Sequence, residues 1–391
     1  MKRQASTQSS EPGSKLPKST STSDDPAAPT ELRPLGEHPK IQNLRMMKAT
    51  NGNEYSVQRL LGEGMFGLVF QVENQFREQF AAKVMKQNDE PDDTWKIELR
   101  ILEKIAEKPH DSLLKLITAE ELDDPPFACT QNMLLTQVLG PSLLDVINNA
   151  TMQIGTAFRG VTFPVPTIRF VGEQMISAMS HLERLGVYHL DLKPENVYFH
   201  CSDFTLSPIA SSKVMEIQML DSLVQIGDFG CSKFHSKDGG PEMASLVQTQ
   251  NYRAPEIFMG LPHSTKTDVW SFAAVICEMY TGQLLFYGTD SPESESTQFE
   301  MMQRVVTQGP TRRMWREAEA LCSKKVACTP RRVEMRHICK KAERTIPLHM
   351  NIRAHEPMAI GLFLMLDDAL IFDPVNRPSF DQLAQHAFFK S

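Results

Sequence analysis

The sequence lacks any apolar stretch long enough to cross a membrane. Its longest such stretch runs from Met358 to Leu366, whereas a spanning helix needs roughly 20 apolar residues. The N-terminus begins with basic residues but has no apolar core, which excludes a secretory signal. We therefore expect a soluble, intracellular protein without a membrane partner.

Paired cysteines and an excess of positive charge are also missing. The seven cysteines occur singly, without a CxxC pair or a His/Cys cluster, so neither a disulfide framework nor a zinc site is expected. The formal net charge is -7 at pH 7, which disfavours nucleic-acid binding by the whole chain. A basic stretch at 311–356 is the exception, and we interpret it as a solvated helical insert. Nucleic acid is therefore not predicted as a partner.

Composition and periodicity divide the 391 residues into a tail and two lobes. Residues 1–50 are rich in Ser, Thr, Pro and Lys and almost free of aromatic residues, so we predict a disordered tail. Alternating apolar residues over 51–139 predict a β-rich lobe. Residues 140–391 show mainly helical spacing, with inserts near 199–224 and 311–356. The prediction is an α+β fold in which a small β-rich N-terminal lobe and a larger helical C-terminal lobe enclose a crevice.

Three glycines lie between the first two strands of the predicted β-rich lobe. Gly62, Gly64 and Gly67 form a G-x-G-x-x-G pattern that is followed by Val69. The dinucleotide-binding fingerprint shares this pattern but joins a strand to a helix, whereas here it joins two strands. Such glycines allow backbone N–H groups to approach phosphate oxygens, and Val69 would then cover a purine. A glycine-rich hairpin without a ligand is the alternative interpretation of this motif alone.

A lysine and a glutamate follow at the positions where a nucleotide-binding ion pair is expected. Lys83 lies in the next predicted strand, where it can contact the α- and β-phosphates. Glu98 lies on the helix after that strand and is the best-placed partner. An ion pair between them would orient the ammonium group of Lys83 toward the phosphates.

Two short runs further along the chain supply the remaining groups that phosphoryl transfer requires. One reads HLDLKPEN and the other reads DFG. Phosphoryl transfer needs cations on the phosphates and a carboxylate that accepts the hydroxyl proton. We assign the carboxylate to Asp191 and the cation near the γ-phosphate to Lys193. Asn196 and Asp228 are predicted metal ligands, whose oxygen atoms suit Mg2+ or Mn2+.

Two further carboxylates are predicted to stabilise the structure around the site. Glu256, at the end of the run YRAPE, is expected to form a buried ion pair with Arg377. Asp268, at the start of an apolar helix, is expected to bind the backbone of the catalytic loop. Both would act on the scaffold and not in the reaction.

In this order, the motifs resemble those of the eukaryotic protein kinase superfamily over about residues 55–390. Within it, the chain is most similar to the cdc2-like (LAMMER) dual-specificity kinases of the cyclin-dependent and MAP-kinase group, as a divergent member. The run LGPSL at 139–143, the long insert at 199–224 and Arg253 support this resemblance. Residues 299–305 also resemble the family signature, of which only Met-Met and Arg remain.

The resemblance implies the bilobal kinase fold and an ATP site in the crevice near residues 137–140. It adds to the nucleotide-binding set five residues, namely Ala81, Thr136, Gln137, Leu139 and Tyr198. Thr136 takes the gatekeeper position before the hinge and is smaller than the aromatic residue usual in the family. Tyr198 replaces a leucine on the floor of the adenine site.

The implied function is ATP-dependent phosphorylation of Ser and Thr, and also of Tyr, in protein substrates such as Arg/Ser-rich splicing factors. Glu195, beside the catalytic loop, could bind a substrate arginine. Leu190 replaces an arginine that docks a phosphorylated activation loop, so we predict activity without such phosphorylation. The family resemblance implies a nuclear location, with the cytoplasm as an alternative. A pseudokinase scaffold without efficient catalysis is the alternative function, and the oligomeric state is left open.

Overall fold

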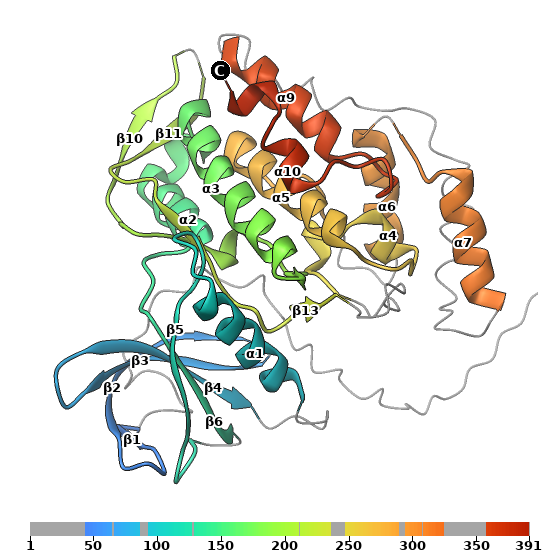
Figure 1. Cartoon of the computed structure of the whole chain (residues 1–391). Coiled ribbons are helices and arrows are strands. Elements are labelled where there is room, and N and C mark those ends of the chain that lie inside the picture. Colours follow the sequence, from blue (N-terminus) through green and yellow to red (C-terminus); the bar gives the residue numbers. More distant parts are fainter. Residues whose placement is uncertain are drawn as a thin grey trace, which may run out of the picture.

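The chain folds into a small lobe built on a sheet and a larger lobe built from helices, as Figure 1 shows. The expected bilobal α+β architecture is therefore confirmed. This computed structural model describes residues 44–64, 66–86, 93–126, 129–210, 212–235, 247–288, 294–306, 308–323 and 357–390. Most of the predicted N-terminal tail lies outside these ranges.

Six antiparallel strands in the order β1-β2-β3-β4-β6-β5 form the sheet of the small lobe. Phe70, Val72 and Leu135 are buried in the core of this sheet. Composition predicts that the ordered lobe begins at residue 51. The first strand lies earlier, and the side chain of Met47 on it is buried. The strands are β1 (Met46–Lys48), β2 (Glu54–Glu63), β3 (Gly67–Asn74), β4 (Gln79–Lys86), β5 (Leu116–Glu121) and β6 (Cys129–Thr136).

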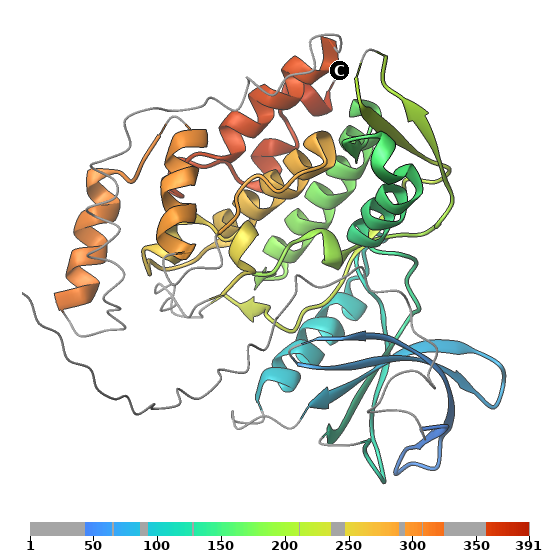
Figure 2. The same ribbon diagram turned by 180° about the vertical axis from the view of Figure 1, so that it is seen from behind.

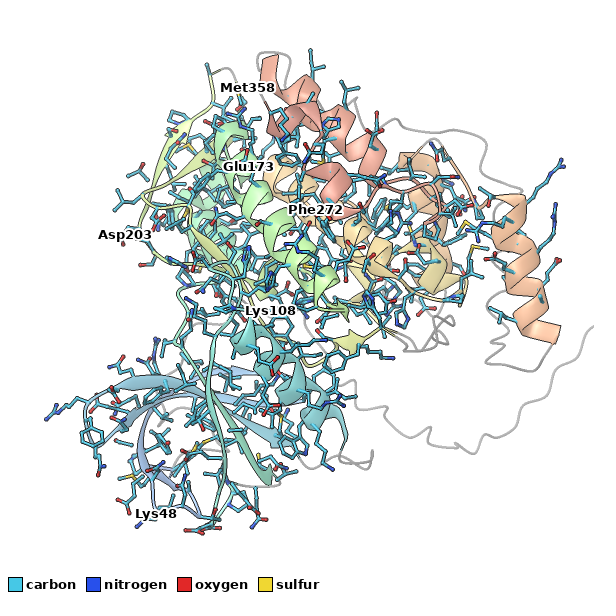
Figure 3. The ribbon with its side chains drawn as sticks, in the orientation of Figure 1. Lys48, Lys108, Glu173, Asp203, Phe272 and Met358 are labelled. Atoms are coloured by element: carbon cyan, nitrogen blue, oxygen red, sulfur yellow. The ribbon has the colours of Figure 1, made fainter. Side chains whose placement is uncertain are left out.

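Helix α1 (Asp93–Glu107) lies between the sheet and the helical lobe (Figures 1 and 2). Ile101, Leu102 and Ile105 are buried along one of its faces, as expected from their helical spacing. Figure 3 shows Lys108, directly after this helix, at the junction of the two lobes, whereas Lys48 marks the far end of the sheet. Helix α1 can therefore carry a side chain into the crevice.

The larger lobe is organised around α5 (Thr265–Thr281), whose residues are almost all buried. Figure 3 shows Phe272 of this helix in the interior of the lobe. Helix α3 packs against it. The other helices are α2 (Leu143–Ile154), α3 (Val165–Arg184), α4 (Pro255–Phe258), α6 (Ser294–Val305), α7 (Arg312–Ser323), α9 (Pro357–Ala369) and α10 (Phe380–Leu383). No helix in the described ranges has the length and apolarity needed to span a membrane.

Short strand pairs hold the loops that face the crevice. Strand β9 (Val197–Phe199) pairs with β12 (Val224–Ile226), and β8 (Val187–Tyr188) pairs with β13 (Lys233–Phe234). These pairs lie on either side of the HLDLKPEN and DFG runs and so fix the ends of both.

The two predicted inserts lie on opposite sides of the helical lobe. The first contains the hairpin of β10 (Phe204–Pro208) and β11 (Val214–Met219), which β7 (Gly160–Thr162) extends to three strands. The second begins with α7, which lies on the side of the lobe remote from β10 in both views (Figures 1 and 2). Residues 324–356 of the second insert are outside the described ranges.

Candidate active site

Lys83, Glu98 and Asp228 meet where the two lobes adjoin. Strand β4 carries Lys83, whose Nζ atom lies 2.7 and 2.9 Å from the two carboxylate oxygens of Glu98 on α1. The same Nζ atom lies 2.9 Å from Oδ1 of Asp228. The predicted pair of Lys83 and Glu98 is therefore confirmed. The structure adds Asp228 as a second carboxylate partner, contributed by the helical lobe.

The pKa shifts of Lys83 and Asp228 indicate that these two groups are charged at neutral pH. Burial by itself would lower the pKa of Lys83, but the carboxylates of Asp228 and Glu98 outweigh it and raise that pKa. Lys83 lowers the pKa of Asp228 to about 2. Burial raises the pKa of Glu98, and the charge of Lys83 opposes this shift. The charged Lys83 is thus fixed between two acids. One of them, Asp228, has a side chain that is 39% exposed.

Asp191 is held by a lysine and a threonine. Its Oδ2 atom lies 3.1 Å from Nζ of Lys193. Its Oδ1 atom accepts hydrogen bonds from the Thr249 hydroxyl at 2.7 Å and from the Thr249 N–H at 3.0 Å. Lys193 in turn donates to the Thr249 hydroxyl at 3.1 Å. Sequence reasoning missed this role of Thr249, which no motif marks and which depends on the activation segment folding back onto the catalytic loop.

The backbone of the catalytic loop is anchored from α5. The carboxylate of Asp268 accepts the N–H groups of His189 at 2.9 Å and Leu190 at 2.8 Å, which confirms the predicted contact. Leu190 has a left-handed backbone with φ of 61°, a conformation that a non-glycine residue holds only when its surroundings enforce it. Burial raises the pKa of Asp268 to about 7, although both N–H groups oppose this shift.

Asn196 and Asp228 have the donor atoms that a divalent cation requires. The side-chain amide of Asn196 donates through Nδ2 to the Asp191 carbonyl at 2.8 Å. This bond uses the amide nitrogen and does not engage the amide oxygen of Asn196. The Gly227 N–H donates to the Asn196 carbonyl at 3.0 Å and so links the two predicted ligands. An amide oxygen and an ionised carboxylate are hard donors that suit Mg2+ or Mn2+. The residues present therefore fit a divalent ion.

The predicted glycine loop connects β2 to β3 above this cluster. A Cβ atom on Gly67 would lie 2.6 Å from the Val84 carbonyl oxygen, so only glycine fits there. Lys86 donates to the Gly64 carbonyl at 2.8 Å, while Gly62 pairs with Val69 across the hairpin. In the next pairing, Val69 lies opposite Lys83. The loop thus adjoins the lysine that the sequence assigns to the phosphates.

The residues predicted to bind adenine lie on β4, at the end of β6 and just after β6. Ala81 pairs with Thr136 in the sheet, and both side chains are buried. The Gln137 side chain hydrogen bonds to Gln225 on β12, which ties the hinge to the floor strands. Leu139 is half-buried and packs against the core of the helical lobe. Sequence reasoning missed Gln225, because its role depends on a pairing between distant segments.

Tyr198 lies on the floor strand β9 and pairs in register with Gln225. Its neighbours Val197 and Phe199 are fully buried in the core of the helical lobe. Because side chains alternate along a strand, the half-buried Tyr198 faces the other side. Burial raises the pKa of its phenol, and the nearby charge of Asp228 adds to this shift.

The ion pair of Glu256 and Arg377 closes the base of the activation segment. Two parallel bonds of 2.9 and 3.0 Å join the guanidinium to the carboxylate, and both side chains are fully buried. The Cζ atom of Arg377 also lies 5.2 Å from the centre of the Trp270 ring. The predicted pair is confirmed, with Trp270 as an additional contact.

Arg253 orders the end of the activation segment by binding carbonyl groups. Its guanidinium donates to the carbonyls of Val247 and Gln248 and lies 3.2 Å from the Glu295 carboxylate. Gln248 has a left-handed φ of 68°. Its side chain is fixed by bonds from its amide to the Ser271 hydroxyl and from the Ala254 N–H. These contacts fix residues 247–254 at the end of the segment.

Comparison with known proteins agrees with this geometry. A family model described as a protein kinase domain matches residues 55–389. The chain is 28% identical over 340 residues to the dual specificity protein kinase CLK2 of Mus musculus. It is 27% identical over 343 residues to the probable dual specificity protein kinase madd-3 of Caenorhabditis elegans. Each alignment covers 86% of this chain, but only 64% of the mouse protein and 36% of the worm protein.

A plant protein and a solved structure extend the comparison. The serine/threonine-protein kinase AFC2 of Arabidopsis thaliana is 25% identical over 346 residues, which cover 86% of this chain and 76% of that protein. A crystal structure of a kinase domain superposes with a TM-score of 0.69 at 25% identity. That superposition covers 88% of this chain and 97% of the other.

Proposed function

This chain belongs to the protein kinase family, and we propose that it transfers the γ-phosphate of ATP to serine and threonine hydroxyls of protein substrates. Relatives named as dual-specificity kinases support an additional activity on tyrosine. The proposed cofactor is a divalent cation, Mg2+ or Mn2+, and the proposed site comprises the residues assigned from the sequence.

The observation that carries this proposal is the completeness of the charged cluster around Lys83 and Asp191. The Lys83 ammonium, already oriented by two carboxylates, would donate to the phosphate oxygens of the nucleotide. Asp191 would orient the substrate hydroxyl and accept its proton, while Lys193 balances the charge on the transferred group. A divalent ion held by Asn196 and Asp228 would neutralise phosphate charge when bound.

Two carboxylates beside the catalytic loop support basic substrates. The Oε2 atom of Glu195 is buried and has no hydrogen-bond partner within the described ranges. Glu278 of α5 accepts the Tyr252 hydroxyl at 2.8 Å, and burial raises its pKa to about 7, to which the charge of Glu195 contributes. Burial raises the pKa of both carboxyl groups, and the charge of Glu195 raises that of Glu278 further, so a cation bound beside them would stabilise their ionised forms. We therefore propose that a substrate arginine binds both, as an Arg/Ser-rich protein would provide.

If the substrates are Arg/Ser-rich splicing factors, the kinase must reach them in the nucleus. We propose a nuclear location for this reason. Imaging of a fluorescently tagged protein in its own cells tests it, and exclusion from the nucleus would contradict it.

Phosphate transfer from labelled Mg-ATP to an Arg/Ser-repeat peptide and to myelin basic protein tests the activity. We expect transfer by the wild type and at least about a thousandfold less by Asp228→Asn, because the variant loses a metal ligand. Asp111→Asn is the matched control, since the Asp111 side chain is fully exposed and is not part of the proposed site. Retained ATP binding without transfer by the wild type would overturn the proposal and favour a pseudokinase scaffold.

A further inference from the structure

The glycine before the DFG run is not required by its backbone. Gly227 follows strand β12 and directly precedes Asp228. It is not among the described glycines with a positive φ, so an alanine could adopt the same backbone. The glycine must therefore be explained by the space around it.

Three side chains surround the space that a Cβ atom on Gly227 would occupy. A Cβ built there lies 3.2 Å from Cε2 of Tyr198, 3.5 Å from a methyl group of Leu139 and 3.6 Å from a methyl group of Leu114. Only the contact with the tyrosine ring is tighter than ordinary van der Waals distance. The Tyr198 ring thus lies against the bare backbone of Gly227.

This contact lies between the hinge and the metal ligands. Leu139 follows the hinge, whereas Gly227 hydrogen bonds through its N–H to the Asn196 carbonyl at 3.0 Å. The carbonyl of Gly227 is bound by Nε2 of His189 at 3.2 Å. These bonds hold Gly227 in place, so a larger residue at 227 would have to displace the Tyr198 ring and not the backbone.

We propose that Tyr198 and Gly227 form a matched pair that sets the space available to the nucleotide on the floor of the site. The absence of a Cβ atom at 227 lets the ring of Tyr198 recede toward the backbone. This leaves the adenine position free, although an aromatic residue occupies the floor. The proposal rests on the proposed ATP site and adds to it a residue that determines nucleotide affinity.

A double-mutant cycle with direct measurement of ADP binding in the presence of Mg2+ tests the pair in the full-length protein. We expect Gly227→Ala to weaken ADP binding roughly tenfold, because the ring is pushed toward the purine. The ADP affinity of Tyr198→Leu is the reference for the double variant. The double variant should bind ADP within about threefold of Tyr198→Leu, since the smaller leucine makes room for the alanine.

Gly160→Ala is the matched control for the glycine substitution. A Cβ atom on Gly160 would meet nothing within 4 Å, and the residue lies on β7 in the helical lobe. This variant should bind ADP as the wild type does. If Gly227→Ala fails to fold by circular dichroism, the folded double variant still decides the question by its ADP binding.

The possible results separate this inference from the proposed function. A double variant that binds ADP much more weakly than Tyr198→Leu would overturn the pair, as would unchanged binding by Gly227→Ala. A wild type that binds ADP but transfers no phosphate would overturn only the proposed kinase activity. A wild type that binds no ADP would overturn both. At saturating ATP, Gly227→Ala should keep its kcat while the KM for ATP rises, which a displaced metal ligand would not produce.

Discussion

This protein contains two clusters in which a basic side chain contacts carboxylates. They differ in whether a carboxylate stays exposed to a ligand. Arg377 and Glu256 meet in a closed pair with both side chains fully buried. Lys83 meets Glu98 and Asp228 at the crevice, where the Asp228 side chain is 39% exposed. The closed pair satisfies its own charges, whereas the open cluster keeps oxygen atoms for a ligand. The first is therefore expected to contribute to stability and the second to chemistry.

Removing the cation of the closed pair should give the largest effect. Arg377→Met leaves the Glu256 carboxylate buried without its partner, which should lower the free energy of unfolding by about 3–5 kcal/mol. Urea denaturation measures this loss. Arg316→Met, on the exposed face of α7, is the control and should change stability little. The comparison fails if both variants unfold at the same urea concentration.

Removing one acid of the open cluster should instead reduce activity without reducing stability. Glu98→Gln weakens the orientation of Lys83, which Asp228 still holds, so kcat/KM should fall roughly a hundredfold. Glu103→Gln, on the exposed side of the same helix, should remain fully active. A large drop in melting temperature for Glu98→Gln would contradict the distinction between the two clusters.

Removing the hydroxyl that positions Asp191 should have a smaller effect on activity. Thr249→Val removes the 2.7 Å hydrogen bond but keeps the shape of the side chain. We expect kcat to fall about tenfold while the KM for ATP changes little, because the backbone N–H of residue 249 still binds Asp191. Thr249→Ser should restore the activity. If the serine variant is as impaired as the valine variant, the hydroxyl is not responsible.

The acids proposed to bind a substrate arginine predict a dependence on pH. The pKa of free Glu278 is about 7, and a bound arginine stabilises the ionised form, so binding releases protons. Affinity for an arginine-containing peptide should therefore rise several-fold between about pH 6 and pH 8. Steady-state KM values measured across this range test the prediction. Glu278→Gln should abolish the pH dependence, and a peptide with alanine in place of arginine should lack it.

Phosphatase treatment should have the smallest effect. Arg253 already binds the carbonyls of Val247 and Gln248, so this end of the segment is held by contacts within the chain. Kinase activity should stay within about twofold of the untreated protein. Arg253→Met should lose much more activity than this. A treated wild type that loses nearly all activity would refute the prediction.

Residues in the open cluster could be predicted because their spacing follows local structure. Lys83 and Glu98 lie on a strand and the next helix, so the order of these two elements predicts their contact. The contacts of Asp268 with the catalytic loop and of Glu256 with Arg377 join distant segments, and they were predicted because each of these residues belongs to a motif. Thr249 was not predicted as a partner of Asp191, because it lies outside the motifs from which the site was assigned and 58 residues from Asp191 in sequence. Nothing local to either residue indicates that the activation segment returns to the catalytic loop.

The sequence alone determined the fold class, the order of the motifs and the charged groups available for phosphoryl transfer. These follow from periodicity and from residue types that few other chemistries need at such spacing. Only the tertiary structure decided which surroundings each group has, since burial and contacts depend on distant segments. Tyr198 illustrates this difference. The space around its ring depends on the absence of a Cβ atom at Gly227, which follows a different strand.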